Sequence, residues 1–169
     1  MIQEVGQNHS ASDSANRWNS QTESRLRDTL LALKRAAAQY YRLTGRPLGV
    51  SDEVGRLVAA EVLGLTLAPD PYAVYDALRA NERILIAARA YPNGTRINCP
   101  RPDAPIDSVM LVTLDSKTMN AEGFWEVKCA GLNQIHPRFR IQGLPIEQFK
   151  KIATQLWSGA WPSYQRKCG

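Results

Sequence analysis

An acidic residue at a strand-like position is the first candidate for chemistry in this sequence. Residues 72–78 (YAVYDAL) are typical of a β-strand, and RANER joins them to a second strand at 84–90 (ILIAARA), so the two runs predict a hairpin. Asp76 lies between apolar residues of the first strand. Because aspartate is disfavoured in strands, a functional role explains this carboxylate better than packing does.

Other catalytic chemistries find little support. The chain has no phosphate-binding P-loop, no GxGxxG and no GxSxG motif. Its two histidines are His9 and His136, and its three cysteines, Cys99, Cys129 and Cys168, are widely spaced without a CxxC pair. We therefore expect neither a zinc site nor a nucleophile triad.

Length and charge narrow the class of protein further. A chain of 169 residues is the size of one domain. Its net charge of +5 and pI of about 9.3 are compatible with a polyanionic partner such as DNA. An odd number of cysteines without a secretory leader favours reduced thiols and a cytoplasmic location. No apolar run approaches the length of a membrane span, so we expect no membrane partner, whereas a homo-oligomer is compatible with the sequence.

The hydrophobic pattern predicts the elements that position these residues. A polar leader, expected to be mobile, covers 1–21, and a basic amphipathic helix follows at 22–45. A second helix begins at Ser51, the expected N-cap, and stops at Gly64. Strands follow, including a buried central strand at 108–115 and an alternating one at 123–131.

The last predicted helix covers 145–157, with short strands expected at 96–100 and 139–144 and an Asn-Gly turn at 91–95. The order of helix, helix, strands and helix predicts a single domain over 22–169. Its fold class is α/β, at the border with α+β: a sandwich in which helices flank a mixed central sheet.

Three stretches carry a family resemblance. They are RLTGRPLGVSDEVGRLVAAEVLGLTLAP, YDALRANERILIAAR and IDSVMLVTLD, within about residues 38–130. The ordered set resembles a bacterial family of small uncharacterised proteins that looks like a branch of the PD-(D/E)xK, or restriction-endonuclease-like, nuclease superfamily. The resemblance implies a restriction-endonuclease-like sandwich and DNA hydrolysis with Mg²⁺ or Mn²⁺, in which the metal offsets phosphate charge and activates water.

By position, the resemblance assigns Glu53 and Asp76 as metal ligands, because Mg²⁺ prefers carboxylate oxygens. It places Leu85 where the superfamily has an acid or Gln, and Ala87 where it has a lysine that stabilises developing negative charge. Arg89 matches the basic residue after that motif. Because Leu85 lacks a side-chain oxygen and Ala87 lacks a cation, the chain is expected to be an impaired or inactive Mg²⁺-dependent endonuclease. The alternative is a catalytically dead nuclease fold that binds DNA or a protein.

A competing set lies downstream. Asp107, or Asp103 in the literal Pro-Asp pair, together with Glu126 and Lys128 satisfies the superfamily spacing. Glu126 and Lys128 share one face of their strand because side chains alternate. The other interpretation is an exposed Glu/Lys pair on a half-buried strand.

Basic residues of the first helix are candidates for contact with DNA phosphates, unless they form an ordinary solvated face. The predicted nucleic-acid-binding residues are Arg27, Lys34, Arg35, Arg42 and, on the second hairpin strand, Arg89.

Overall fold

The computed structural model describes residues 20–70, 72–91, 95–132 and 142–158. The leader expected at 1–21 lies outside these ranges except for its last two residues, which begin the first helix. Residues 92–94 of the expected turn and residues 139–141 of the expected strand at 139–144 also lie outside them. No helix within the described ranges has the length and apolar character needed to cross a membrane.

Two helices open the described chain. The first, α1 (Ser20–Thr44), agrees with the expected helix at 22–45 and is followed by Gly45, whose φ of 67° is left-handed. The second, α2 (Ser51–Leu63), stops as expected at Gly64, whose φ is 64° and whose N–H bonds to Ala60 O. The expected Ser51 cap is wrong: Val50 precedes the helix without a side-chain cap, because Ser51 already belongs to the first turn.

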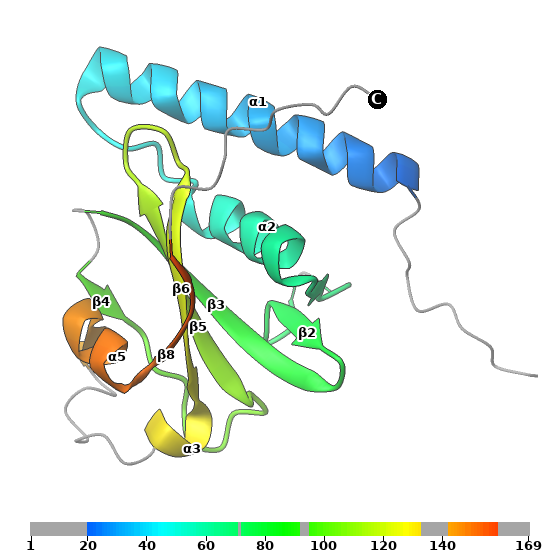
Figure 1. The fold of residues 1–169 in the computed structure, drawn as a ribbon, viewed down its shortest axis with the longest axis vertical. Coiled ribbons are helices and arrows are strands. Elements are labelled where there is room, and N and C mark those ends of the chain that lie inside the picture. The colour runs from blue at the N-terminus through cyan, green and yellow to red at the C-terminus, as the bar shows by residue number, and fades with distance from the viewer. Residues whose placement is uncertain (1–19, 71, 92–94, 133–141, 159–169) are drawn as a thin grey trace, which may run out of the picture.

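A six-stranded mixed sheet forms the centre of the fold (Figure 1). Its order is β1-β2-β3-β5-β6-β8; β3 and β5 are parallel, and the other neighbours are antiparallel. The strands are β1 (Thr66–Leu67), β2 (Ala77–Arg79), β3 (Glu82–Tyr91), β5 (Ser108–Asp115), β6 (Ala121–Lys128) and β8 (Thr154–Ser158). A separate ribbon pairs β4 (Arg96–Ile97) with β7 (Leu144–Pro145). As predicted, β5 is buried almost throughout.

The hairpin exists, but its first strand is shorter than expected. Strand β2 begins at Ala77 rather than at residue 72, and Tyr72 and Val74 are exposed in the preceding loop. Arg79 pairs with Glu82 across a turn in which Ala80 has a φ of 53°. Asp76 therefore lies immediately before the strand, which removes the conflict between aspartate and strand propensity.

The C-terminal helix was predicted too long. Helix α5 (Ile146–Ile152) ends at Ala153, which is extended, and β8 follows it. Beyond Phe149, the apolar residues of the predicted helix do not form a buried helical face, since Ile152 and Leu156 are exposed. The backbone of β8 pairs with β6, and this non-local pairing outweighs the helical periodicity of 145–157. The expected strand 123–131 likewise ends at Lys128, where α3 (Cys129–Leu132) begins.

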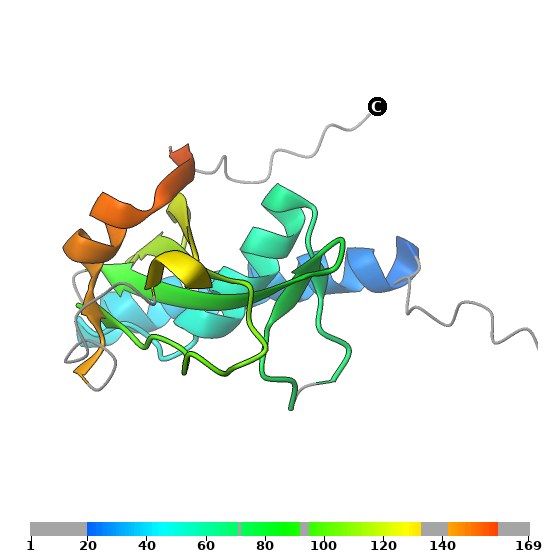
Figure 2. The ribbon, with the colours of Figure 1, turned by 90° about the horizontal axis from the view of Figure 1, so that it is seen from below.

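Each face of the sheet has its own apolar core. Helices α1 and α2 cover one face, and α5 with the β4–β7 ribbon covers the other (Figure 1). Gly55 allows α2 to approach β3 closely, since a Cβ there would lie 2.2 Å from that of Ala88. The N-terminal end of α1 extends beyond the sheet (Figure 2). The described chain is thus a mixed α/β fold with helices on both sides of one sheet.

Candidate functional site

Glu53 and Asp76 meet on the same side of the sheet through Arg56. Arg56 Nη2 lies 3.4 Å from Glu53 Oε1, one turn earlier in α2, and Arg56 Nε lies 3.2 Å from Asp76 Oδ1. The two carboxylates predicted from the sequence therefore contact the same side chain. That side chain, Arg56, was not among the predicted site residues.

Asp76 is the more buried acid of the pair, with a side chain 16% exposed. Its Oδ2 accepts a hydrogen bond from the Ile86 N–H at 2.7 Å. Burial raises the pKa of Asp76; the Ile86 hydrogen bond and Arg56 oppose that rise, while Asp52 and Glu53 add to it. Asp76 thus ties the start of β2 to β3 and to α2.

These residues, as arranged, do not fit a Mg²⁺ ion. The positive guanidinium of Arg56 contacts both carboxylates, and Glu53 is 64% exposed. Arg56 Nε is buried and makes no hydrogen bond within the described ranges, so it meets Asp76 as an ion pair only. Among the described residues, no three His, Cys, Asp or Glu side chains are grouped to hold a metal.

Leu85 and Ala87 lie on the other face of the sheet. Side chains alternate along β3, so Ile84, Ile86 and Ala88 join the core beneath α2, whereas Leu85 and Ala87 pack against the opposite core. The structure therefore does not bring positions 85 and 87 together with Glu53 and Asp76. A lysine at position 87 would start from the wrong face of the strand.

Arg89 points toward the N-terminus of α2. Its Nη1 lies 3.3 Å from Asp52 Oδ1 and donates to Ala88 O at 2.7 Å, while its Nε donates to Arg96 O at 3.0 Å. Asp52 also accepts a hydrogen bond from the Ala88 N–H at 3.3 Å. Arg89 is thus engaged in holding α2, β3 and β4 together.

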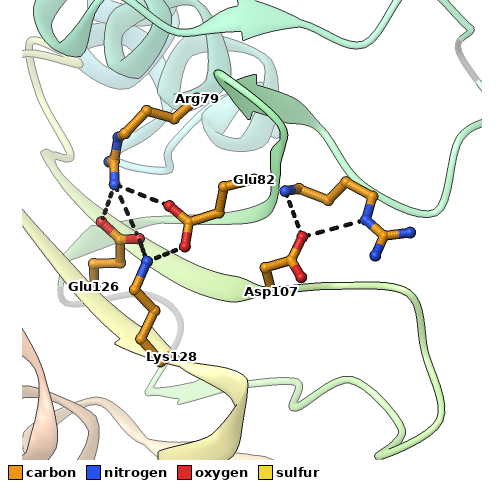
Figure 3. Close-up of polar contacts among 6 residues, drawn as sticks. Arg79, Glu82, Asp107, Glu126 and Lys128 are labelled. Carbon is orange, nitrogen blue, oxygen red and sulfur yellow. Dashed lines mark hydrogen bonds and ion pairs between the residues drawn. The ribbon is translucent and has the colours of Figure 1, made fainter.

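A second charged cluster surrounds Glu126 (Figure 3). Arg79 Nη1 donates to Glu126 Oε2 at 2.9 Å and lies 3.5 Å from Glu82 Oε2. Lys128 Nζ contacts Glu82 Oε1 and lies 3.5 Å from Glu126 Oε1. We call these two acids and two bases the Glu126 network. It joins the end of β2, the start of β3 and the end of β6.

Glu126 is buried, so the expected exposed Glu/Lys pair is wrong for this residue. Its side chain is only 6% exposed, on a strand that lies between β5 and β8 in the sheet. Burial tends to raise the pKa of Glu126, but the neighbouring Ser108 hydroxyl together with Arg79 and Lys128 outweighs it, and the pKa lies below its ordinary value. The hydrogen bond with Glu82 is the largest cause that raises the pKa of Lys128. The Glu126 carboxylate is therefore already matched by two cations.

Asp107, the third member of the downstream set, pairs elsewhere. Its Oδ2 accepts hydrogen bonds from the Arg83 N–H at 2.7 Å and from Arg83 Nε at 3.2 Å, and these bonds lower its pKa. Figure 3 shows Asp107 apart from the Glu126 network. Asp103 pairs with Arg101 at 3.8 Å on the surface.

The four predicted DNA-binding residues of α1 divide into two groups. Arg27 Nε lies 3.2 Å from Glu61 Oε1, and Lys34 Nζ donates to Asn120 Oδ1. Burial lowers the pKa of Lys34, with Glu61 acting in the opposite direction. Arg35 and Arg42 are exposed on the side of α1 away from the core. Within the described ranges, the side chains of this second group make no ion pair.

Sequence reasoning missed the bases that neutralise the acids. Arg56 stands three residues after Glu53 in a predicted helix, a spacing that places the two side chains together. Arg79 stands three residues before Glu82 at the hairpin turn. Its contact with Glu126 spans 47 residues, and no local signal predicts it.

No family model matches the chain, and the comparison with curated proteins finds no match. The chemistry of the site therefore rests on its own geometry. Each cluster of carboxylates is neutralised by Arg or Lys and links several elements. Arg35 and Arg42, on the outward face of α1, are exposed and form no ion pair within the described ranges.

Proposed function

We propose that the protein is a DNA-binding module of restriction-endonuclease-like architecture that does not hydrolyse phosphodiester bonds. The observation that carries the proposal is Arg56, whose guanidinium contacts both Glu53 and Asp76. The family resemblance assigns a metal ion to those two carboxylates. Here a side chain of the protein itself supplies the neutralising charge.

Loss of catalysis has a second support in β3. Hydrolysis in this superfamily requires a cation that stabilises the charge developing on the phosphate. Position 87 holds alanine, whose side chain packs against the core on the opposite face from Asp76. The lysine of the downstream set, Lys128, is paired with Glu82 and Glu126. Neither set offers a base or cation that is available to a substrate.

DNA binding is supported by the distribution of charge on α1. Residues 20–46 contain six basic and two acidic residues, which accounts for most of the net charge of +5. Arg35 and Arg42 are seven residues apart, or about 10 Å along the helix axis, and share one face. Arg46 follows, also exposed, and within the described ranges these three guanidinium groups make no ion pair. Such a row suits successive phosphates better than it suits a protein core.

The binding test compares two pairs of charge reversals in the full chain. One variant carries Arg35→Glu and Arg42→Glu; the matched control carries Arg101→Glu and Lys151→Glu, which are exposed outside α1 and change the net charge equally. Affinity for a short fluorescent DNA duplex is measured by anisotropy. We expect the α1 variant to bind at least about tenfold more weakly than the control. Equal weakening in both would mean that net charge, not α1, governs binding.

The cleavage test uses plasmid and single-stranded DNA with Mg²⁺ or Mn²⁺. We expect the parent chain to leave both substrates intact. If the parent cleaves DNA and Asp76→Asn abolishes the cleavage, the protein is a Mg²⁺-dependent endonuclease with Glu53 and Asp76 as its metal ligands. If Lys128→Ala abolishes the cleavage instead, the downstream set carries the chemistry. Absence of both binding and cleavage would favour a nuclease-like fold that binds a protein.

A further inference from the structure

Two cysteines pack against the same apolar core, on the far side of the sheet from α1 and α2. Cys99 stands two residues beyond β4, and Cys129 is the first residue of α3, directly after β6. Both are half-buried and pack against the cluster that contains Ile97 and Val127. Both thiols are reduced in the structure.

The backbone brings the two cysteines to this place. The Cys129 N–H donates to Asp107 O at 2.9 Å, which ties α3 to the end of the segment that leads from Cys99 to β5. Ile97, two residues before Cys99, is fully buried in the same cluster as Val127, two residues before Cys129. The two thiols therefore share one small core. Burial is the main cause that raises the pKa of Cys129, and the nearby charges of Asp107 and Cys99 raise it further.

We propose that Cys99 and Cys129 are a modification site that reacts with a small-molecule disulfide, such as oxidised glutathione, to form an internal disulfide bond. The bond would join the segment after β4 to the end of β6. It would close the chain between two residues 30 positions apart in the sequence. The site is independent of the proposed DNA-binding face.

The reaction is ordinary thiol–disulfide exchange. The thiolate of one cysteine attacks a sulfur of the oxidised reagent, which forms a mixed disulfide and releases one reagent thiolate. The thiolate of the second cysteine then attacks the protein sulfur of the mixed disulfide, which forms the Cys99–Cys129 bond and releases the second reagent thiolate. The protein loses two electrons and two protons in total, and the reagent gains them as two thiols.

Burial sets the rate of this exchange. The thiolate is the nucleophile, and a raised pKa leaves little of Cys129 ionised near neutral pH. We therefore expect slow closure at neutral pH and a rate that rises up to about tenfold for each added pH unit.

The test is intact-mass spectrometry of the folded chain in a Cys168→Ser background, incubated with oxidised glutathione and then treated with a thiol-blocking reagent. The expected product is lighter than the reduced chain by two hydrogen atoms, carries no blocking group and yields one peptide pair linked through Cys99 and Cys129. The bond should also raise the thermal unfolding midpoint, which returns to its starting value after reduction.

Two further variants keep the test decisive. Cys99→Ser and Cys129→Ser, each in the same background, cannot close the bridge, so their remaining thiol should stop at the mixed disulfide. If the parent with both cysteines also stops at mixed disulfides, or stays fully reduced while a denatured sample reacts, the two sulfurs do not reach each other and the proposal is wrong.

Discussion

Replacing Glu126 with Gln tests whether the Glu126 network stabilises the fold. The change keeps the size of the side chain and removes its charge, so little cavity or strain is added. Arg79 then loses a charged acceptor at 2.9 Å, and Lys128 loses one at 3.5 Å. Both cations keep Glu82 as a partner.

The expected loss lies between that of a buried and that of an exposed ion pair. Breaking a buried pair costs about 3–5 kcal/mol, and an exposed pair contributes about 0–1 kcal/mol. Glu126 is 6% exposed, but Arg79 is 37% and Lys128 59% exposed, so solvent screens the interaction. We therefore expect Glu126→Gln to lower the free energy of unfolding by about 1–2 kcal/mol at neutral pH. For a chain of this size the unfolding midpoint should fall by about 2–8 °C.

The assay is urea unfolding of the parent and the variant at several pH values. Because the pKa of Glu126 is lowered in the folded state, its contribution is present above the unfolded pKa and is lost as pH falls through the folded pKa. The difference between parent and variant should be largest near pH 7 and should shrink below about pH 4.

Glu122→Gln supplies the matched control, since Glu122 is an exposed acid on the same strand. We expect this control to change stability by less than about 0.5 kcal/mol. If the two variants are equally stable at neutral pH, or if their difference does not change with pH, the Glu126 network is not a stabilising feature and the reasoning is refuted.

Three further changes test the positioning of the candidate site. Gly55→Ala should lower the free energy of unfolding by about 1–3 kcal/mol, because the added Cβ would lie 2.2 Å from that of Ala88; unchanged urea unfolding would mean that α2 does not approach β3 so closely. Ala87→Lys should lower stability by a similar amount, about 1–3 kcal/mol, without creating Mg²⁺-dependent cleavage; a gain of plasmid cleavage would show that position 87 reaches the upstream carboxylates. Asp76→Asn should change the pH dependence of stability in the opposite sense to Glu126→Gln. Because burial raises the pKa of Asp76, its contribution to stability is present at low pH and is lost as pH rises through the folded pKa. The variant should therefore gain stability relative to the parent between about pH 4 and 7, as urea unfolding at those pH values would show.

Local pattern predicted those elements that local forces determine. The apolar spacing of α1 and α2, the left-handed glycine that stops α2 and the continuous apolar run of β5 all agree with the structure. The helix predicted at 145–157 was too long because Thr154 and its neighbours have a helical apolar spacing yet form an edge strand paired with β6. Strand pairing between distant segments cannot be predicted from the residues within a short window of sequence.

The candidate site was predictable to a similar depth. Glu53 and Asp76 were selected from sequence, and the structure brings them together. Arg56, one helical turn from Glu53, was not predicted as a site residue because the resemblance assigns carboxylates and a lysine to the site. Positions 85 and 87 were assigned to the same site by analogy, but side chains alternate along β3, and the sequence does not show which of its two faces α2 covers.

The salt dependence of DNA binding by the parent chain tests the central claim most directly. If Arg35, Arg42 and Arg46 each neutralise one phosphate, the slope of log affinity against log salt is about −2.7, and affinity falls about 40-fold between about 50 and 200 mM salt. We expect a slope close to that value for the parent and a shallower one for the Arg35→Glu and Arg42→Glu variant. A parent that binds without salt dependence, or that does not bind DNA at all, would contradict the account.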